Sequence, residues 1–338
     1  MSLNIDFSGL LNYAKVIAGK VNDVMLNLIK GEPEELYKAS LHLIKAGGKR
    51  LRPLATVLAG RMYGLSEDLG VIAGASVEII HNFTLIHDDI IDRDEFRRGV
   101  PTVHKLWGNE MAILAGDLLF AKAYEVMSSL TGYGIEERYV LEAIKELTWA
   151  TTVLAEGQAL DLQLERRRDV GIKDYIDMVY RKTAALFKSA VVIGATIAGA
   201  PRDEIEKLAG YAINVGIAFQ IRDDELGLVA DEKVLGKPIY SDLREGKKTI
   251  HVIYALARSS PAQRAKILSV LGKRDADRER LEEVAGIIME LGALEYSSKL
   301  ADEYLSKGLS YLNRTKPVDE EARHYLELLA RYVTRRIY

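Results

Sequence analysis

Apolar residues recur along the chain at intervals of three and four positions, the spacing that lines one face of an α-helix. Residues 71–80 form one wide stripe of this kind, and residues 154–162 form another. No convincing series of short alternating segments, separated by hairpin turns, indicates β-strands. The pattern therefore predicts an all-α fold.

Several prolines fall where the helical pattern begins or ends. We expect helices at residues 8–29, 34–46, 51–64, 68–92, 109–131, 135–166, 172–199, 203–230 and 247–258, with several more toward the carboxyl terminus. Residues 93–108 and 231–246 are expected to be irregular. Because no Gly/Ser-rich or Pro-rich linker divides the chain, we expect residues 1–338 to form a single domain.

The composition is that of a globular protein with a substantial core. Of the 338 residues, 48% are hydrophobic and 28% charged, which excludes a disordered or fibrous chain. The 46 Lys and Arg residues are balanced by 49 Asp and Glu residues, so no overall basic field would attract nucleic acid. The absence of cysteine excludes disulfides, thiolate nucleophiles and cysteine-ligated zinc.

Two features argue against a membrane span and against export. The most apolar run, residues 190–200, is far shorter than the ~20 residues that a bilayer core requires. The amino terminus carries Asp6 and lacks the basic region and apolar stretch of a secretion signal. We therefore expect a soluble, cytoplasmic protein.

An acidic cluster, HDDIID at residues 87–92, ends a strongly apolar helical stretch. Asp88 and Asp92 are four positions apart, so their carboxylates lie on one helix face, ~6 Å from each other. Such like charges repel unless a cation sits between them. Mg²⁺ suits this arrangement, since it takes one or two protein carboxylates together with substrate phosphates. A solvated acidic helix end is the structural alternative for this cluster alone.

A second acidic cluster, FQIRDDELG at residues 219–227, also ends an apolar helical stretch. Two separated clusters of this kind in one all-helical chain suggest two walls of one cavity that offers carboxylates to metal ions.

Basic residues accompany both acidic clusters. They are Arg93, Arg97 and Arg98 after the first, and Lys237, Lys247 and Lys248 after the second. Earlier, residues 47–53 combine a glycine turn, a helix start and three cations, which can bind a phosphate. His81 shares a helix face with Asp88, ~10 Å deeper. Alone, the turn would be a helix C-cap with solvated charges, and His81 a core histidine.

Five segments resemble the trans-isoprenyl diphosphate synthases, in the order and spacing of that family, and the resemblance covers most of the chain. They are GGKRLRP at 47–53, LIHDDIIDRDEFRRGVPTVH at 85–104, GQALD at 157–161, RKTA at 181–184 and FQIRDDELG...GKPIYSD...EGKKT at 219–249. Each segment is moderately specific, and together they are very specific. The chain is most similar to the archaeal geranylgeranyl diphosphate synthases.

The resemblance implies an isoprenoid-synthase helical bundle with a deep central cavity, assembled as a homodimer. In such enzymes an allylic diphosphate ionises, and isopentenyl diphosphate attacks the resulting carbocation. Proton loss then leaves a product longer by one isoprene unit. The implied partners are these two diphosphates, and the implied cofactor is Mg²⁺.

The resemblance also implies roles for individual residues. The Mg²⁺ ligands, which would act in catalysis together with Lys182, would be Asp88, Asp92 and Asp223, supported by Asp89 and Asp224. The residues at the departing allylic diphosphate would be Arg97, Lys182, Thr183, Gln220, Lys237 and Lys247. The residues that bind isopentenyl diphosphate would be Lys49, Arg52, His81 and Arg98. Cations at these places would stabilise the negative charge that ionisation puts on the leaving group.

One position departs from the pattern of many members. Gly227 stands where they carry a third Asp in the second acidic motif. Some members that resemble the archaeal geranylgeranyl diphosphate synthases also have glycine there, so we interpret it as a mark of that subfamily. The second motif then depends on Asp223 and Asp224.

In this family the product length is set by bulky residues below the first acidic motif. Helix geometry alone favours Thr84, four positions before Asp88, as the residue beneath it. The family pattern instead assigns the bottom of the cavity to an aromatic residue five positions before, here Phe83. With no two-residue insertion in the motif, this favours a twenty-carbon product, geranylgeranyl diphosphate. Ordinary core packing is the alternative for Phe83.

Other functions fit less well. The same chemistry could stop at fifteen carbons or continue to twenty-five. A non-catalytic regulatory subunit of a synthase would be expected to have eroded Asp motifs, whereas both are present. A terpene cyclase would not need the second diphosphate site around Lys49, Arg52 and His81.

Overall fold

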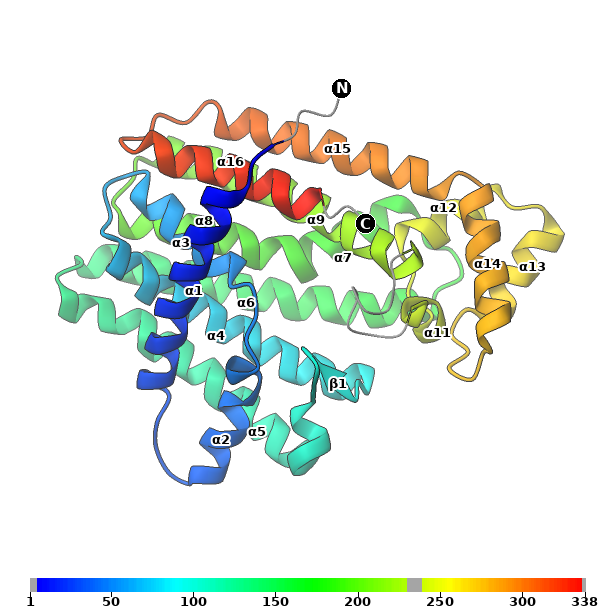
Figure 1. Cartoon of the computed structure of the whole chain (residues 1–338), viewed down its shortest axis with the longest axis horizontal. Coiled ribbons are helices and arrows are strands. Elements are labelled where there is room, and N and C mark those ends of the chain that lie inside the picture. Colours follow the sequence, from blue (N-terminus) through cyan, green and yellow to red (C-terminus); the bar gives the residue numbers. More distant parts are fainter. Residues whose placement is uncertain (1–4, 230–238, 336–338) are drawn as a thin grey trace. The chain divides into compact units, whose positions relative to one another are not determined.

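The computed structural model describes residues 5–229 and 239–335, and helices account for most of them (Figure 1). The predicted all-α fold is confirmed. Chain contacts divide the protein into two compact units. The first unit lies within Met1–Thr151, Leu186–Ala212 and Leu309–Tyr332, and the second within Thr152–Ala185, Ile213–Gly308 and Val333–Tyr338. The single domain over residues 1–338 stays a prediction.

The helices follow one another with short connections. In the amino-terminal half they are α1 (Ser8–Leu28), α2 (Glu34–Lys45), α3 (Leu51–Arg61), α4 (Glu67–Asp92), α5 (Val103–Ser128), the 3₁₀ turn η1 (Ser129–Tyr133) and α6 (Glu137–Arg166). The later elements are α7 (Ile172–Val179), the π-helical turn η2 (Tyr180–Ala184), α8 (Ala185–Ile197), α9 (Arg202–Val229), α11 (Ser241–Glu245), α12 (Ile250–Arg258), α13 (Pro261–Val270), α14 (Arg278–Glu290), α15 (Ala293–Leu312) and α16 (Glu320–Thr334).

Three parts of the chain differ from the sequence-based prediction. Residues 93–108 contain a short antiparallel hairpin of β1 (Phe96–Arg97) and β2 (Val100–Pro101), and α5 begins at Val103 with a break at Gly108, where φ is 83°. The helix predicted at 172–199 is interrupted by η2. In the segment predicted to be irregular, α11 occupies Ser241–Glu245, and residues 230–238 lie outside the described part.

Helix α4 is the central helix of the first unit and packs against α1, α3 and α5. Its contact with α3 is close: a Cβ added at Gly74 would lie 2.9 Å from the Cα of Pro53, so a larger side chain would push the two helices apart. By length and composition α4 could cross a membrane. The sequence alone did not identify this helix as a possible span, because only the most apolar run of residues was considered. However, 72% of its apolar window is buried inside the protein, as expected for a core helix.

Candidate active site

The first acidic cluster lies at the carboxyl end of α4, where Arg93 leaves the helix in a left-handed conformation with φ of 60°. Asp88 and Asp92 are half-buried, whereas Asp89 is completely buried. Arg97, from β1, donates to Asp89 Oδ1 and, at 3.2 Å, to Asp94 Oδ2. Burial raises the pKa of Asp89 to about 6 even though Arg97 opposes the shift. The ion pair between Arg97 and Asp89 thus links the hairpin to the carboxyl end of α4.

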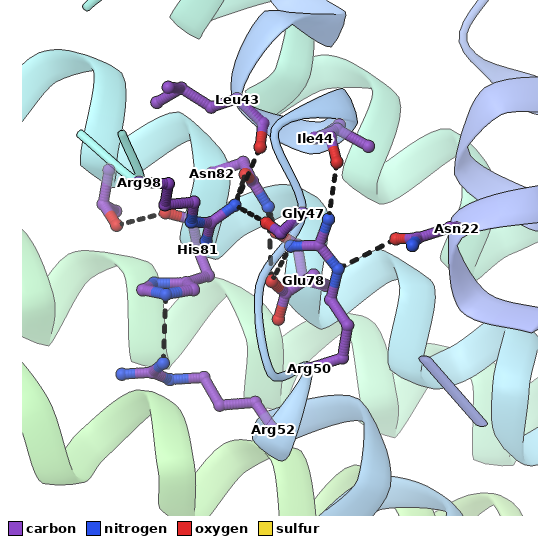
Figure 2. Close-up of polar contacts among 11 residues, drawn as sticks. Asn22, Leu43, Ile44, Gly47, Arg50, Arg52, Glu78, His81, Asn82 and Arg98 are labelled. Atoms are coloured by element: carbon purple, nitrogen blue, oxygen red, sulfur yellow. Dashed lines mark hydrogen bonds and ion pairs between the residues drawn. The ribbon is translucent and has the colours of Figure 1, made fainter. Parts of the chain in front are cut away.

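Deeper along α4 lies a group of positively charged or basic side chains, which we call the cationic cluster: Arg50, Arg52, His81 and Arg98 (Figure 2). Arg52 Nη1 lies 3.1 Å from His81 Nε2. Because a guanidinium can only donate, the histidine accepts this hydrogen bond and is neutral. Burial, together with Arg52 and Arg98, holds the pKa of His81 well below its ordinary value.

Arg98 joins this cluster from the turn of the hairpin. Its Nη1 donates to the backbone carbonyls of Leu43, at 2.8 Å, and of Gly47. Burial and the neighbouring Arg50 lower the pKa of Arg98 to about 10. Arg52 and Arg98 are partly buried cations that destabilise each other, and together with His81 they form a site suited to a multiply charged anion such as a diphosphate.

Lys49, the remaining residue expected at this site, is exposed just before α3. Its ammonium lies 5.8 Å from the centroid of the Tyr332 ring. The structure therefore brings Arg52, His81 and Arg98 together, and it places Lys49 on the glycine-containing turn that precedes α3.

In the second unit, the second acidic cluster lies near the end of α9, and a chain of hydrogen bonds holds Asp224. Thr183 Oγ1 donates to Gln220 Oε1 at 2.8 Å, and Gln220 Nε2 donates to Asp224 Oδ1 at 2.7 Å. The other carboxylate oxygen of Asp224 accepts a bond from the Tyr175 hydroxyl, also at 2.7 Å. Burial and the nearby Asp242 raise the pKa of Asp224 to about 8.

Two lysines of the second unit share one carboxylate. Lys182 Nζ lies 2.7 Å and Lys247 Nζ 3.0 Å from Asp161 Oδ2. Burial alone would raise the pKa of Asp161, but the two lysines hold it below its ordinary value. Asp161 thus keeps two ammonium groups together, each partly exposed. Lys237, which was expected to join them, lies outside the described residues.

The π-helical turn η2 carries both Lys182 and Thr183. Such turns arise from one extra residue in a helix and are frequent at functional sites. The turn lies directly against α6, where a Cβ added at Gly157 would be 2.3 Å from the backbone nitrogen of Lys182. Glycine at 157 is therefore required for this approach of backbone to backbone.

The two residues considered for product length have different surroundings. The Phe83 ring packs edge-on against His87 and against Phe120 of α5, with centroids 4.8 and 5.5 Å apart. Thr84 is buried, and its hydroxyl donates to the His81 carbonyl at 2.8 Å. Phe83 is the larger of the two, and its ring contacts α5.

A magnesium ion fits the donor set at the end of α4. Asp88 and Asp92 offer hard carboxylate oxygens one helical turn apart, which is the contribution that Mg²⁺ takes from a protein when phosphates complete its shell. Over residues 5–229 and 239–335, no three His, Asp or Glu side chains form a group that could hold a metal by themselves. The two carboxylates of α4 suit a metal ion whose remaining ligands come from substrate phosphates and water.

Sequence reasoning missed several side chains that lie beside the predicted site residues. They are Arg50, Glu78, Asp161, Tyr175 and Asp242. A Cβ at Gly227 would lie 2.9 Å from Asp242 Oδ2, so a side chain at position 227 would require Asp242 to shift. Asp161 could have been found, because it ends the GQALD segment, but its partner lysines are distant in sequence.

Comparison with known proteins shows which family this chain resembles. Residues 33–288 match the polyprenyl synthetase family. The geranylgeranyl diphosphate synthase of Sulfolobus acidocaldarius is 42% identical over 96% of this chain and 98% of that protein. The geranylfarnesyl diphosphate synthase of Aeropyrum pernix is 45% identical over 94% and 99%. The crystal structure of geranylgeranyl pyrophosphate synthetase from Pyrococcus horikoshii superposes with a TM-score of 0.90, at 37% identity over 98% and 99% of the two chains.

Proposed function

The chain belongs to the polyprenyl synthetase family, the trans-isoprenyl diphosphate synthases, and we propose that it condenses isopentenyl diphosphate with an allylic diphosphate to give geranylgeranyl diphosphate. The primer would be farnesyl diphosphate or a shorter allylic diphosphate. One observation carries the proposal: α4 bears the acidic pair Asp88 and Asp92 at its end and His81 of the cationic cluster two turns deeper. A reaction between two diphosphates needs two such sites.

In this proposal each site handles one diphosphate. Lys49, Arg52, His81 and Arg98 bind that of isopentenyl diphosphate. Asp88, Asp92 and Asp223 hold Mg²⁺, which when bound offsets charge on the allylic diphosphate and favours its departure. Lys182 and Lys247 stabilise the same developing charge, and Asp161 sets their position. The remaining residues proposed for this diphosphate are Arg97, Thr183, Gln220 and Lys237.

The product length is the finer part of the proposal, and Phe83 is its determinant. We expect Phe83→Ala to shift the main product from twenty to twenty-five carbons or more, because removing the ring opens space beside Phe120 and below Asp88. Chromatography of dephosphorylated products measures the shift. Phe120→Ala, which removes the neighbouring ring and leaves Phe83 in place, serves as the comparison. An unchanged product distribution in Phe83→Ala would refute this assignment.

We also propose that the enzyme is a cytoplasmic homodimer. Support for the dimer comes from large apolar side chains exposed on α5 and α6 of the first unit: Ile113, Leu114, Phe120 and Leu141. Covering such a surface with a second copy would bury it. Light scattering is expected to give about twice the mass of one chain, and Leu114→Glu to shift it toward one. A wild-type mass of one chain would contradict the dimer.

The reaction itself is tested by incubating the purified protein with labelled isopentenyl diphosphate, Mg²⁺ and each allylic primer in turn. The expected result is Mg²⁺-dependent formation of a twenty-carbon diphosphate. A twenty-five-carbon product would retain the chemistry and correct the length, as the name of the Aeropyrum pernix relative makes worth testing. Absence of elongation with every primer would overturn the proposed function.

A further inference from the structure

Arg50 belongs to the GGKRLRP segment but cannot itself bind a substrate in this structure. Its side chain is 0% exposed, so no atom of the guanidinium faces solvent. The residue precedes α3 in a left-handed conformation, with φ of 48° and ψ of 39°. This backbone turn directs the side chain of Arg50 inward at the place where Lys49 and Arg52, its neighbours in sequence, are proposed to bind a diphosphate.

The Arg50 guanidinium joins the start of α3 to three other helices (Figure 2). Its Nε donates to Asn22 Oδ1 of α1 at 2.9 Å, and its Nη2 donates to the carbonyl of Ile44 in α2 at 2.8 Å. Its Nη1 forms an ion pair of 2.8 Å with Glu78 of α4. A planar fork that meets three acceptors in fixed directions holds the backbone of this turn far more tightly than an ammonium would.

Glu78 connects this fork to the rest of the cationic cluster. It is 2% exposed and precedes His81 by less than one helical turn. Asn82 Nδ2 donates to the carbonyl of Glu78 at 2.8 Å and lies 3.4 Å from its carboxylate. Asn82 Oδ1 in turn lies 3.4 Å from Arg98 Nη1. A continuous set of polar contacts thus runs from Arg50 through Glu78 and Asn82 to Arg98.

The charge of Glu78 also acts on the cationic cluster. Burial lowers the pKa values of Arg52 and Arg98, and Glu78 opposes this effect for both. A buried carboxylate therefore offsets part of the mutual repulsion of these side chains before any anion binds.

We propose that Arg50 and Glu78 are positioning residues for isopentenyl diphosphate: they hold Arg52, His81 and Arg98 in the arrangement that binds its diphosphate, without touching it. The inference rests on the proposed function and extends it to side chains behind the site. The inference concerns isopentenyl diphosphate alone, because the contacts of the Arg50 guanidinium lie at the cationic cluster and not at the acidic end of α4.

Arg50→Lys tests this inference, because it keeps the charge and loses the three-way fork. We expect the KM for isopentenyl diphosphate to rise at least about tenfold, as a small misplacement of binding groups does. The KM for the allylic diphosphate and the kcat at saturation should stay within about twofold. Calorimetric titration with isopentenyl diphosphate should show the same weakening, and thermal unfolding monitors the fold.

Arg61→Lys is the matched control, since Arg61 is a partly buried arginine of the same unit that pairs with Asp319 and Glu321. It should lower thermal stability without changing either KM. An unchanged KM for isopentenyl diphosphate in Arg50→Lys, or an equal rise in both KM values, would overturn the inference. Wild-type protein that binds no isopentenyl diphosphate would overturn it together with the proposed function.

Glu78→Gln separates position from charge and serves if Arg50→Lys does not fold. If Glu78 acted by charge alone, removing it would raise the local positive potential, and isopentenyl diphosphate would bind more tightly. If it holds Arg50 and Asn82 in place, binding weakens. A higher KM for isopentenyl diphosphate supports the inference, whereas an unchanged or lower one contradicts it.

Discussion

Asp88→Asn is expected to lower kcat about 10³-fold, on the order of what removing a group that stabilises transition-state charge costs. The amide keeps the size of the side chain but loses the charge that we propose holds Mg²⁺ beside the allylic diphosphate. Because Asp88 is half-buried at the helix end and is not part of the core, thermal stability should change little. Steady-state kinetics at saturating Mg²⁺ and both substrates measures the effect.

The control is Asp68→Asn, at the opposite end of the same helix. Asp68 is largely exposed, and its carboxylate pairs with Lys20 at 3.0 Å. This variant should retain wild-type kcat within about twofold, because Asp68 lies at the other end of α4 from the acidic cluster. Its stability should also change little, since exposed ion pairs contribute little to stability. Equal losses in the two variants would mean that a general change in α4, and not a metal ligand, explains the result.

Lys182→Gln is expected to lower kcat about 10²-fold, because it removes one of the cations that we propose stabilise the departing diphosphate. It also leaves Asp161 with Lys247 alone, so the second lysine should lose part of its orientation. The binding of isopentenyl diphosphate should stay close to that of wild type, which distinguishes this site from the cationic cluster. Single-turnover measurements separate the chemical step from substrate binding.

Lys188→Gln is the matched control for that prediction. Lys188 is also a partly buried lysine in an ion pair, with Glu146 at 2.7 Å, and it lies over the Trp149 ring. Its replacement should reduce thermal stability and leave kcat nearly unchanged. If both variants lost activity in proportion to stability, the proposed role of Lys182 would be wrong.

Helical periodicity was sufficient to predict most of the fold, because each helix has an apolar face that its neighbours bury. It could not predict the hairpin at residues 96–101, whose strands are two residues long and fastened by Arg97 and Asp89. Nor could it predict the π-helical turn η2, because the apolar pattern continues through the helix predicted at residues 172–199, whereas the turn packs closely against Gly157, which is distant in sequence.

The chemistry of the site was visible in sequence where charges are close together, as in residues 87–92. Side chains that act through others were not. Glu78 lies within an apolar stretch, and nothing in the spacing shows that Arg50 turns inward to it while Lys49 stays exposed. Arg50 has a left-handed backbone, and its side chain meets acceptors on α1, α2 and α4, which are distant in sequence.

We propose that both acidic motifs bind the allylic diphosphate through Mg²⁺, and calorimetry can test this binding without turnover. The titrant is an allylic diphosphate whose bridging oxygen is replaced by sulfur, which resists ionisation. We expect Mg²⁺-dependent binding to the wild-type protein, and we expect this binding to weaken by at least about tenfold, or ~1.4 kcal/mol, in both Asp88→Asn and Asp223→Asn. Binding that needs no divalent ion, or that is unaffected by Asp223→Asn, would contradict it.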